Sequence, residues 1–223
     1  MKLKGVSEVL GSLLVLLTIV GVAGIIYTMS YSTILSGQEN VKMRNAYFDM
    51  FELREKIDRV RSGLEFKSVY KIQLYDLSVD FGNEPIVIIN NTNYNLASIK
   101  LIGRGWTITY ENGAIILSQN FKPQMMSSPN VNYVKETRTL YFPAIKLKTN
   151  LSTGGIGAIT IYFHLNNIKT VTGNGSIVFY SNNADTWKEF FELIGVDFTR
   201  SGNNITIHDV NYFVVIYEVE VYG

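Results

Sequence analysis

A long uncharged segment near the N-terminus limits the folding of this chain more than any other feature. From Val9 to Gln38 the sequence contains no Asp, Glu, Lys or Arg, and residues 9–29 are mostly apolar or small. A helix needs about 20 consecutive apolar residues to cross a hydrocarbon layer about 30 Å thick. We therefore expect residues 9–29 to form a helix that is long enough to span a membrane.

The residues before this segment indicate how it is processed. Lys2 and Lys4 form a basic stub that ends at Gly5, whereas a conventional secretory signal places its cleavage site after the apolar region. The string Lys-Gly-Val-Ser-Glu-Val-Leu-Gly, residues 4–11, resembles the class III signal peptide of archaeal type IV pilins and pilin-like proteins. The resemblance implies that a prepilin peptidase cuts between Gly5 and Val6, so that residues 1–5 are a leader.

The same resemblance implies roles in assembly for Glu8, Gly11 and Ser12. A charged side chain inside a membrane costs at least several kcal/mol unless it is paired. In pilin-like assembly the partner of Glu8 would be the freed α-amine of Val6 on a neighbouring subunit; alternatively, Glu8 stays hydrated at the level of the headgroups. Gly11 and Ser12 are small enough to let helices approach closely.

Two other interpretations of the N-terminus remain open. The helix fits an uncleaved signal anchor equally well, and Gly21-Val22-Ala23 fits a conventional cleavage site that would release a domain starting at Gly24. In each case Lys2 and Lys4 predict a cytoplasmic N-terminus with the later part of the chain outside the cell.

Helical periodicity resumes after the apolar segment. Apolar residues at positions 50, 53, 57, 60 and 64 recur at intervals of three and four, Tyr47, Phe48 and Phe51 widen this stripe, and Gly63 is a natural stop. We expect one helix over residues 6–62, with a membrane or filament part at 6–36 and an amphipathic part at 39–62. Gly37 is an expected weak point in it.

Residues 66–223 are predicted to form a β-rich extracellular head. Asn112-Gly113 and Gly202-Asn203 are typical hairpin turns, and residues 184–194 have the pattern of a short amphipathic helix with Asn183 as its cap. The fold class is therefore α+β, with a mainly antiparallel sandwich or twisted sheet. Segments rich in β-branched and aromatic residues mark the expected strands, at residues 69–81, 85–89, 107–110, 114–117, 139–147, 158–165, 176–180, 205–207 and 212–222.

Parts of the head also resemble a known group of domains. Residues 110–114, 159–163 and 185–191 are similar to extracellular domains that follow the same Val-Ser-Glu-Val start in archaeal pilin-like proteins. That resemblance implies a location at the cell surface and no particular ligand.

Composition argues against several classes of function. The chain has 20 basic and 19 acidic side chains, so no field favours nucleic acid, and it contains no cysteine for disulfides or thiolate chemistry. His164 and His208 stand far apart, and no nucleophile, phosphate loop or cofactor motif is evident. We expect no enzymatic activity, no cofactor and no metal site. Candidate N-glycosylation sequons begin at Asn90, Asn150, Asn174 and Asn204.

The sequence therefore predicts a type IV pilin-like surface subunit, a structural component of an archaeal pilus or similar filament with a possible part in adhesion. Its expected partners are the membrane, prepilin peptidase and other pilin subunits. Its expected location is the cell membrane with an extracellular C-terminal domain, or a filament at the cell surface. The alternative is a membrane-anchored extracellular binding module that does not polymerise.

Overall fold

A computed structural model describes residues 3–120, 122–148 and 152–222 of the chain. The chain forms two compact units, Met1–Lys42 and Met43–Gly223. The first helix, α1 (Leu3–Arg61), contributes its residues up to Lys42 to the first unit and the remainder to the second. The fold class is α+β, as predicted: a long N-terminal apolar helix, mostly antiparallel β-structure and one short helix.

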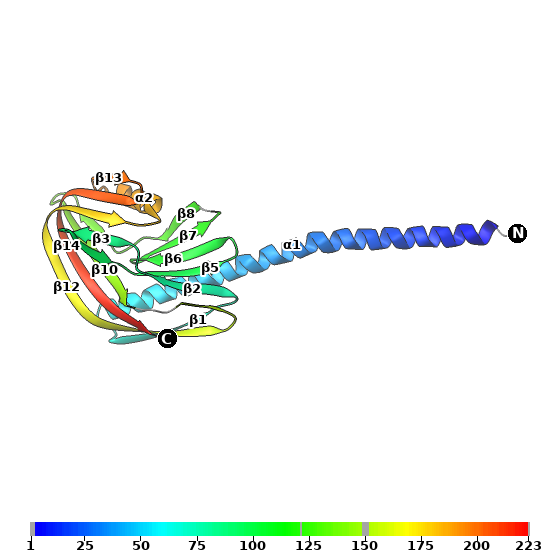
Figure 1. Ribbon diagram of the computed structural model, residues 1–223, viewed down its shortest axis with the longest axis horizontal. Coiled ribbons are helices and arrows are strands. Elements are labelled where there is room, and N and C mark those ends of the chain that lie inside the picture. The colour runs from blue at the N-terminus through cyan, green and yellow to red at the C-terminus, as the bar shows by residue number, and fades with distance from the viewer. Residues whose placement is uncertain (1–2, 121, 149–151, 223) are drawn as a thin grey trace. The chain divides into compact units, whose positions relative to one another are not determined.

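The second unit contains two β-sheets (Figure 1). The 8-stranded sheet, here called sheet A, has the order β4-β3-β12-β14-β10-β9, with β1 paired to β12 and β13 paired to β14. Its strands are β1 (Lys67–Gln73), β3 (Ile86–Ile89), β4 (Thr92–Asn95), β9 (Asn132–Val134), β10 (Thr139–Lys148), β12 (Ala158–Tyr180), β13 (Phe198–Ser201) and β14 (Asn204–Tyr222).

The 6-stranded sheet, here called sheet B, has the order β11-β2-β5-β6-β7-β8 and is antiparallel throughout. Its strands are β2 (Leu77–Gly82), β5 (Ser98–Gly103), β6 (Trp106–Glu111), β7 (Ala114–Gln119), β8 (Lys122–Ser127) and β11 (Ser152–Gly155). In sheet A, by contrast, β10 and β14 run parallel to each other.

Sheet B is covered on both faces at β7, because neighbouring residues of this strand belong to different cores. Ile115 packs in the core that contains the second half of α1, whereas Ala114 and Ile116 pack in the core that contains the short helix α2 (Ala184–Ile194). Successive side chains of a strand point to opposite faces, so the apolar run at 114–117 is the sequence signature of a strand buried on both sides.

Sheet A contributes to both cores because its long strands bend (Figure 1). On β10, the adjacent residues Ala144 and Ile145 are both buried, yet Ala144 belongs to the α2 core and Ile145 to the α1 core. The parallel partner β14 changes core in the same region, between Ile216 and Val219. Two expected pairs of short strands are continuous: β12 includes 158–165 and 176–180, and β14 includes 205–207 and 212–222. The single strand expected at 69–81 is wrong, because this segment is divided between β1 in sheet A and β2 in sheet B.

The predicted stripe of α1 is confirmed in its central part. Met50, Leu53, Ile57 and Val60 are fully buried against strands of both sheets. The stripe is narrower and shorter than predicted: Phe48 and Phe51 are about half exposed, and Leu64 lies beyond the end of the helix with 74% of its surface exposed. Gly63, at φ 72°, takes the left-handed conformation that follows a helix end. Gly37 does not interrupt α1.

Helix α2 has the predicted bounds and the predicted buried face. Trp187, Phe190 and Phe191 pack in the core, while Asp185, Glu189 and Glu192 are exposed. Asn183 occupies the N-cap position, but its side chain does not cap the helix, which corrects the prediction. The amide binds Glu111 instead, as described below.

Both predicted hairpin turns are confirmed. Asn112 and Gly113 have φ values of 47° and 88° and join β6 to β7, and Gly202-Asn203 joins β13 to β14. The positive φ at both residues of the first turn is typical of a type I′ hairpin, which explains the Asn-Gly sequence.

The packing of α1 can be tested with two substitutions that introduce the same charge. Ile57→Asp buries a carboxylate at a fully enclosed position and should lower the free energy of unfolding by about 4 kcal/mol. Phe51→Asp, on the exposed side of the same helix, should cost about 1 kcal/mol or less. Thermal or urea unfolding of the detergent-solubilised protein measures both. Similar losses for the two variants would contradict the helix register.

Candidate functional site

The surface of the first unit is apolar along the helix. Large side chains from Val9 to Ile34 are mostly more than half exposed in the single chain, including Leu13 at 54%, Leu16 at 62% and Val20 at 62%. Over an 18-residue stretch this helix has a mean hydropathy of 2.7, so by length and composition it is able to cross a membrane. A signal sequence satisfies the same criterion.

Five Ser and Thr hydroxyl groups on this segment are bonded within the helix itself. Ser12 Oγ donates to the Val9 carbonyl over 2.9 Å, and Thr18 Oγ1 donates to the Leu14 carbonyl over 2.8 Å. Thr28, Thr33 and Ser36 bind carbonyls three or four residues earlier in the same way. An apolar surrounding offers no water to such groups, so internal bonding makes this surface compatible with lipid or with other apolar helices.

The predicted processing and assembly residues all belong to α1. Gly5, Val6 and Glu8 lie in its first turns, and their side chains are outside the described part of the chain. A Cβ atom built on Gly11 would meet no atom within 4 Å beyond its chain neighbours and the backbone of its own helix, and Ser12 is exposed. Both positions therefore remain open to a neighbouring helix, and their role in assembly stays a prediction.

The sequons differ in their surroundings. The Nδ2 atom of Asn90 donates to the Tyr212 hydroxyl over 2.9 Å, and that of Asn174 donates to Asn211 Oδ1 over 2.9 Å. Asn204 begins β14 and is exposed. Asn150 lies outside the described residues.

The two histidines of the chain, His164 and His208, have different partners. His164 Nδ1 lies 3.0 Å from the Phe66 carbonyl oxygen, and His208 Nε2 lies 2.8 Å from the Thr199 hydroxyl. Within the described ranges no group of three or more His, Asp or Glu residues is arranged to hold a metal ion.

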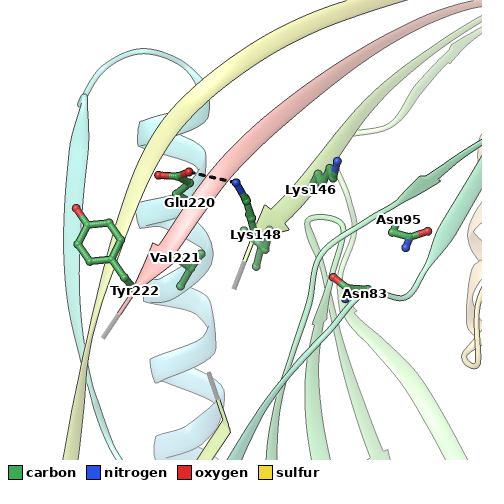
Figure 2. Close-up of a pocket in the computed structure, with 8 residues that line it drawn as sticks. Asn83, Asn95, Lys146, Lys148, Glu220, Val221 and Tyr222 are labelled. Atoms are coloured by element: carbon green, nitrogen blue, oxygen red, sulfur yellow. Dashed lines mark ion pairs between the residues drawn. The ribbon is translucent and has the colours of Figure 1, made fainter. Parts of the chain in front are cut away.

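A wide groove lies near the end of β14 (Figure 2). It has a volume of about 580 Å³, and Asn83 and Asn95 lie across it from the ends of β10 and β14. Both lysines of this groove already form ion pairs: Lys146 Nζ is 3.3 Å from Glu218 Oε1, and Lys148 Nζ is 3.7 Å from Glu220 Oε1. These pairs follow from the parallel register, which sets each lysine of β10 beside a glutamate of β14.

Glu111, at the end of β6, is a buried ionisable group with several hydrogen-bond partners. Only 3% of its surface is exposed. Its Oε1 accepts hydrogen bonds from Trp187 Nε1 over 2.8 Å and from the Ser181 hydroxyl, and its Oε2 accepts one from Asn183 Nδ2 over 2.6 Å. The carboxyl group therefore joins sheet B to the end of β12 and to the first turn of α2.

Sequence analysis did not identify Glu111 as important. A single Glu before an Asn-Gly turn has the pattern of an exposed hairpin end, and its three donors stand about 70 residues or more later in the chain. Burial raises the pKa of Glu111 above its ordinary value of 4.5, and the hydrogen bonds from Ser181, Asn183 and Trp187 oppose this shift.

Comparison with known proteins places the chain in a family without an assigned activity. Residues 4–221 match DUF7289, a family of unknown function. The chain belongs to this family. It is also 29% identical to an uncharacterised protein of Archaeoglobus fulgidus, over 85% of this chain and 81% of that protein. No solved structure matches the chain.

The buried carboxyl group of Glu111 should give this protein a specific pH dependence of stability. The folded protein holds the Glu111 proton more tightly than the unfolded chain, so the associated stability is fully present below about pH 4.5 and is lost as the pH rises through the folded-state pKa. Relative to Glu111→Gln, the free energy of unfolding of the natural protein should therefore decline with rising pH across that window.

Urea unfolding of both proteins at a series of pH values measures this difference directly. The comparison isolates Glu111 from the other carboxyl groups, because those groups are common to both proteins. A difference that stays constant with pH would contradict the raised pKa.

Proposed function

We propose that this protein is a non-enzymatic, type IV pilin-like surface subunit. The proposal rests chiefly on one observation: α1 carries both an apolar surface long enough to cross a membrane and, further along, a stripe buried in a β-rich unit. Such a helix joins an extracellular domain to an apolar environment without an intervening linker. The pilin-like start at residues 4–11 supports the same function.

In this proposal the subunit is first inserted into the membrane. Lys2 and Lys4 hold the N-terminus in the cytoplasm, and the β-rich unit lies outside the cell. Prepilin peptidase then cuts after Gly5. The new α-amine of Val6 is placed to neutralise Glu8 of a neighbouring subunit, which lowers the cost of a carboxylate at membrane depth.

Assembly into a filament requires replacement of the lipid around α1. Removal of an apolar helix from a bilayer is favourable only where other apolar helices cover the same surface. The internally bonded hydroxyls of Ser12 and Thr18 support this step, since neither of them needs water as a partner. Partners would be copies of this chain or a major pilin.

Processing after Gly5 is the first test of this function. Protein purified from native membranes should begin at Val6 by N-terminal sequencing and intact mass. Gly5→Arg should block cleavage but not insertion, because the apolar segment is unchanged. A mature chain that begins at Met1 or Gly24 would contradict the proposal and favour the anchor or the conventional signal.

Cross-linking between chains is the second test. The chain has no cysteine, so single cysteines at Leu13, Leu16 or Val20 report contacts without background. Each position is more than half exposed in one subunit, and disulfides should form between chains in filaments sheared from the surface. Electron microscopy should show filaments that disappear on deletion of the gene.

A cysteine at Leu193 is the matched control. This residue on α2 is 79% exposed, and a membrane-impermeant maleimide should label it in intact cells without cross-linking. Labelling at Leu193 together with protein that stays in membrane pellets, without cross-links, would reject the filament. The protein would then be a membrane-anchored extracellular binding module.

A further inference from the structure

A second groove, here called the sheet B groove, lies on the face of sheet B beside the N-terminus of α2. It has a volume of about 340 Å³, within the range of about 300–1,000 Å³ typical of small-molecule sites. β5 contributes Ser98, Lys100 and Ile102, β6 contributes Thr107, Thr109 and Glu111, and β7 contributes Ser118, while Glu84, Asn182 and Asn183 complete the lining.

Strand register explains why these polar residues meet. Ser98 stands opposite Glu111, and Lys100 stands opposite Thr109 in the β5–β6 ladder. Thr107 stands opposite Ser118 in the β6–β7 ladder. Side chains two residues apart on a strand share a face, so adjacent rows of the sheet form one continuous polar surface.

Several of these polar groups are buried to an extent that is unusual for Ser and Thr. Ser98 is 2% exposed and Thr109 is 4% exposed. The Ser98 hydroxyl has no hydrogen-bond partner among the described residues, although its oxygen is enclosed. Buried polar groups normally have partners, so the Ser98 hydroxyl is an exception, and the accessible polar groups of the groove are those of Lys100, Thr107 and Ser118, which are partly exposed.

The side chains that line the sheet B groove disfavour several kinds of ligand. Lys100 forms no ion pair within the described ranges, but Glu84 and the carboxyl group of Glu111 share the groove with it, which disfavours a strongly anionic ligand. A divalent cation is disfavoured because Lys100 would repel it and because Asn183, Ser181 and Trp187 already occupy both oxygens of Glu111. An apolar ligand would meet only Ile102 as a large apolar contact.

We propose that the sheet B groove binds a neutral, hydroxyl-rich ligand, such as a single sugar residue of a glycan. Such a ligand both donates and accepts hydrogen bonds, which matches the hydroxyls of Thr107, Thr109 and Ser118 and the ammonium of Lys100. The site is held rigidly, because the carboxyl group of Glu111 is fixed by donors from the β12–α2 connection and α2. This inference does not depend on filament formation.

Direct binding to the full-length protein tests the site. The protein is solubilised in a zwitterionic detergent without sugar, and glucose, galactose, mannose and N-acetylglucosamine are titrated separately by saturation-transfer NMR. At least one sugar should bind saturably. Thr109→Val keeps the shape but removes a hydroxyl, and Lys100→Met removes the ammonium; each should weaken binding about tenfold, as the loss of one good hydrogen bond predicts.

Thr170→Val is the matched control, since Thr170 is an exposed strand residue on β12 and does not line the groove. It should bind the sugar like the natural protein. Lys100 is partly exposed, so Lys100→Met keeps the test informative if Thr109→Val folds poorly. The inference is overturned if none of the sugars binds saturably, if all variants bind equally, or if phosphate or calcium binds instead with the same dependence on Lys100 and Thr109.

Discussion

The hairpin end formed by Glu111 and Asn112 holds the parts of the β-rich unit together. Glu111 accepts three hydrogen bonds from Ser181, Asn183 and Trp187, and the buried Asn112 Oδ1 accepts one from the Ile145 N–H over 2.8 Å. These adjacent residues therefore connect sheet B to α2 on one side and to the bend of β10 on the other. Removal of either side chain would leave buried donors without partners, which costs more than the loss of an ordinary surface contact.

Glu111 and Asn112 lie where the two cores meet. Sheet B has an apolar core on each face, and sheet A reaches both because β10 and β14 bend at Ala144–Ile145 and Ile216–Val219. The backbone N–H of Ala97 donates to the Ile145 carbonyl over 2.6 Å, so both backbone groups of Ile145 are bound from the region around sheet B. Strand β9 pairs with β10 only at Thr139–Tyr141, and these contacts supply partners on the edge of β10 beyond that point.

The same arrangement separates the parts of the molecule that we associate with different tasks. The apolar surface of the first unit suits lipid or neighbouring helices, and the hydroxyls of Ser12 and Thr18 are bonded within the helix. The sheet B groove, in the second unit, is lined by polar groups, three of which are almost fully buried. A surface subunit with this division would use one part for anchorage or assembly and the other for contact with ligands. Membership of DUF7289 assigns neither task.

Much of the fold could be predicted from the sequence because the relevant signals are local. Helix α2 was predicted with its observed bounds, since its apolar residues recur with the helical period of 3.6 residues. The Asn112-Gly113 turn and the buried stripe at Met50, Leu53, Ile57 and Val60 were predicted for similar reasons. The short strands β4 and β9 were missed, because three or four residues carry too little pattern. The six-residue strands β5 and β8 were missed as well.

The candidate sites, like the fold, could be predicted from the sequence only in part. The sequence by itself determined the apolar segment, its flanking charges and the pilin-like start, because these are properties of consecutive residues. Only the tertiary structure decided that Glu111 is buried among Ser181, Asn183 and Trp187 and that Asn183 binds this carboxyl group instead of capping α2. It also decided that Ser98, Lys100 and Thr109 share one groove. The physical reason is that strand pairing and the docking of α2 join residues distant in the chain, and long-range contacts leave no periodic signal in a single sequence.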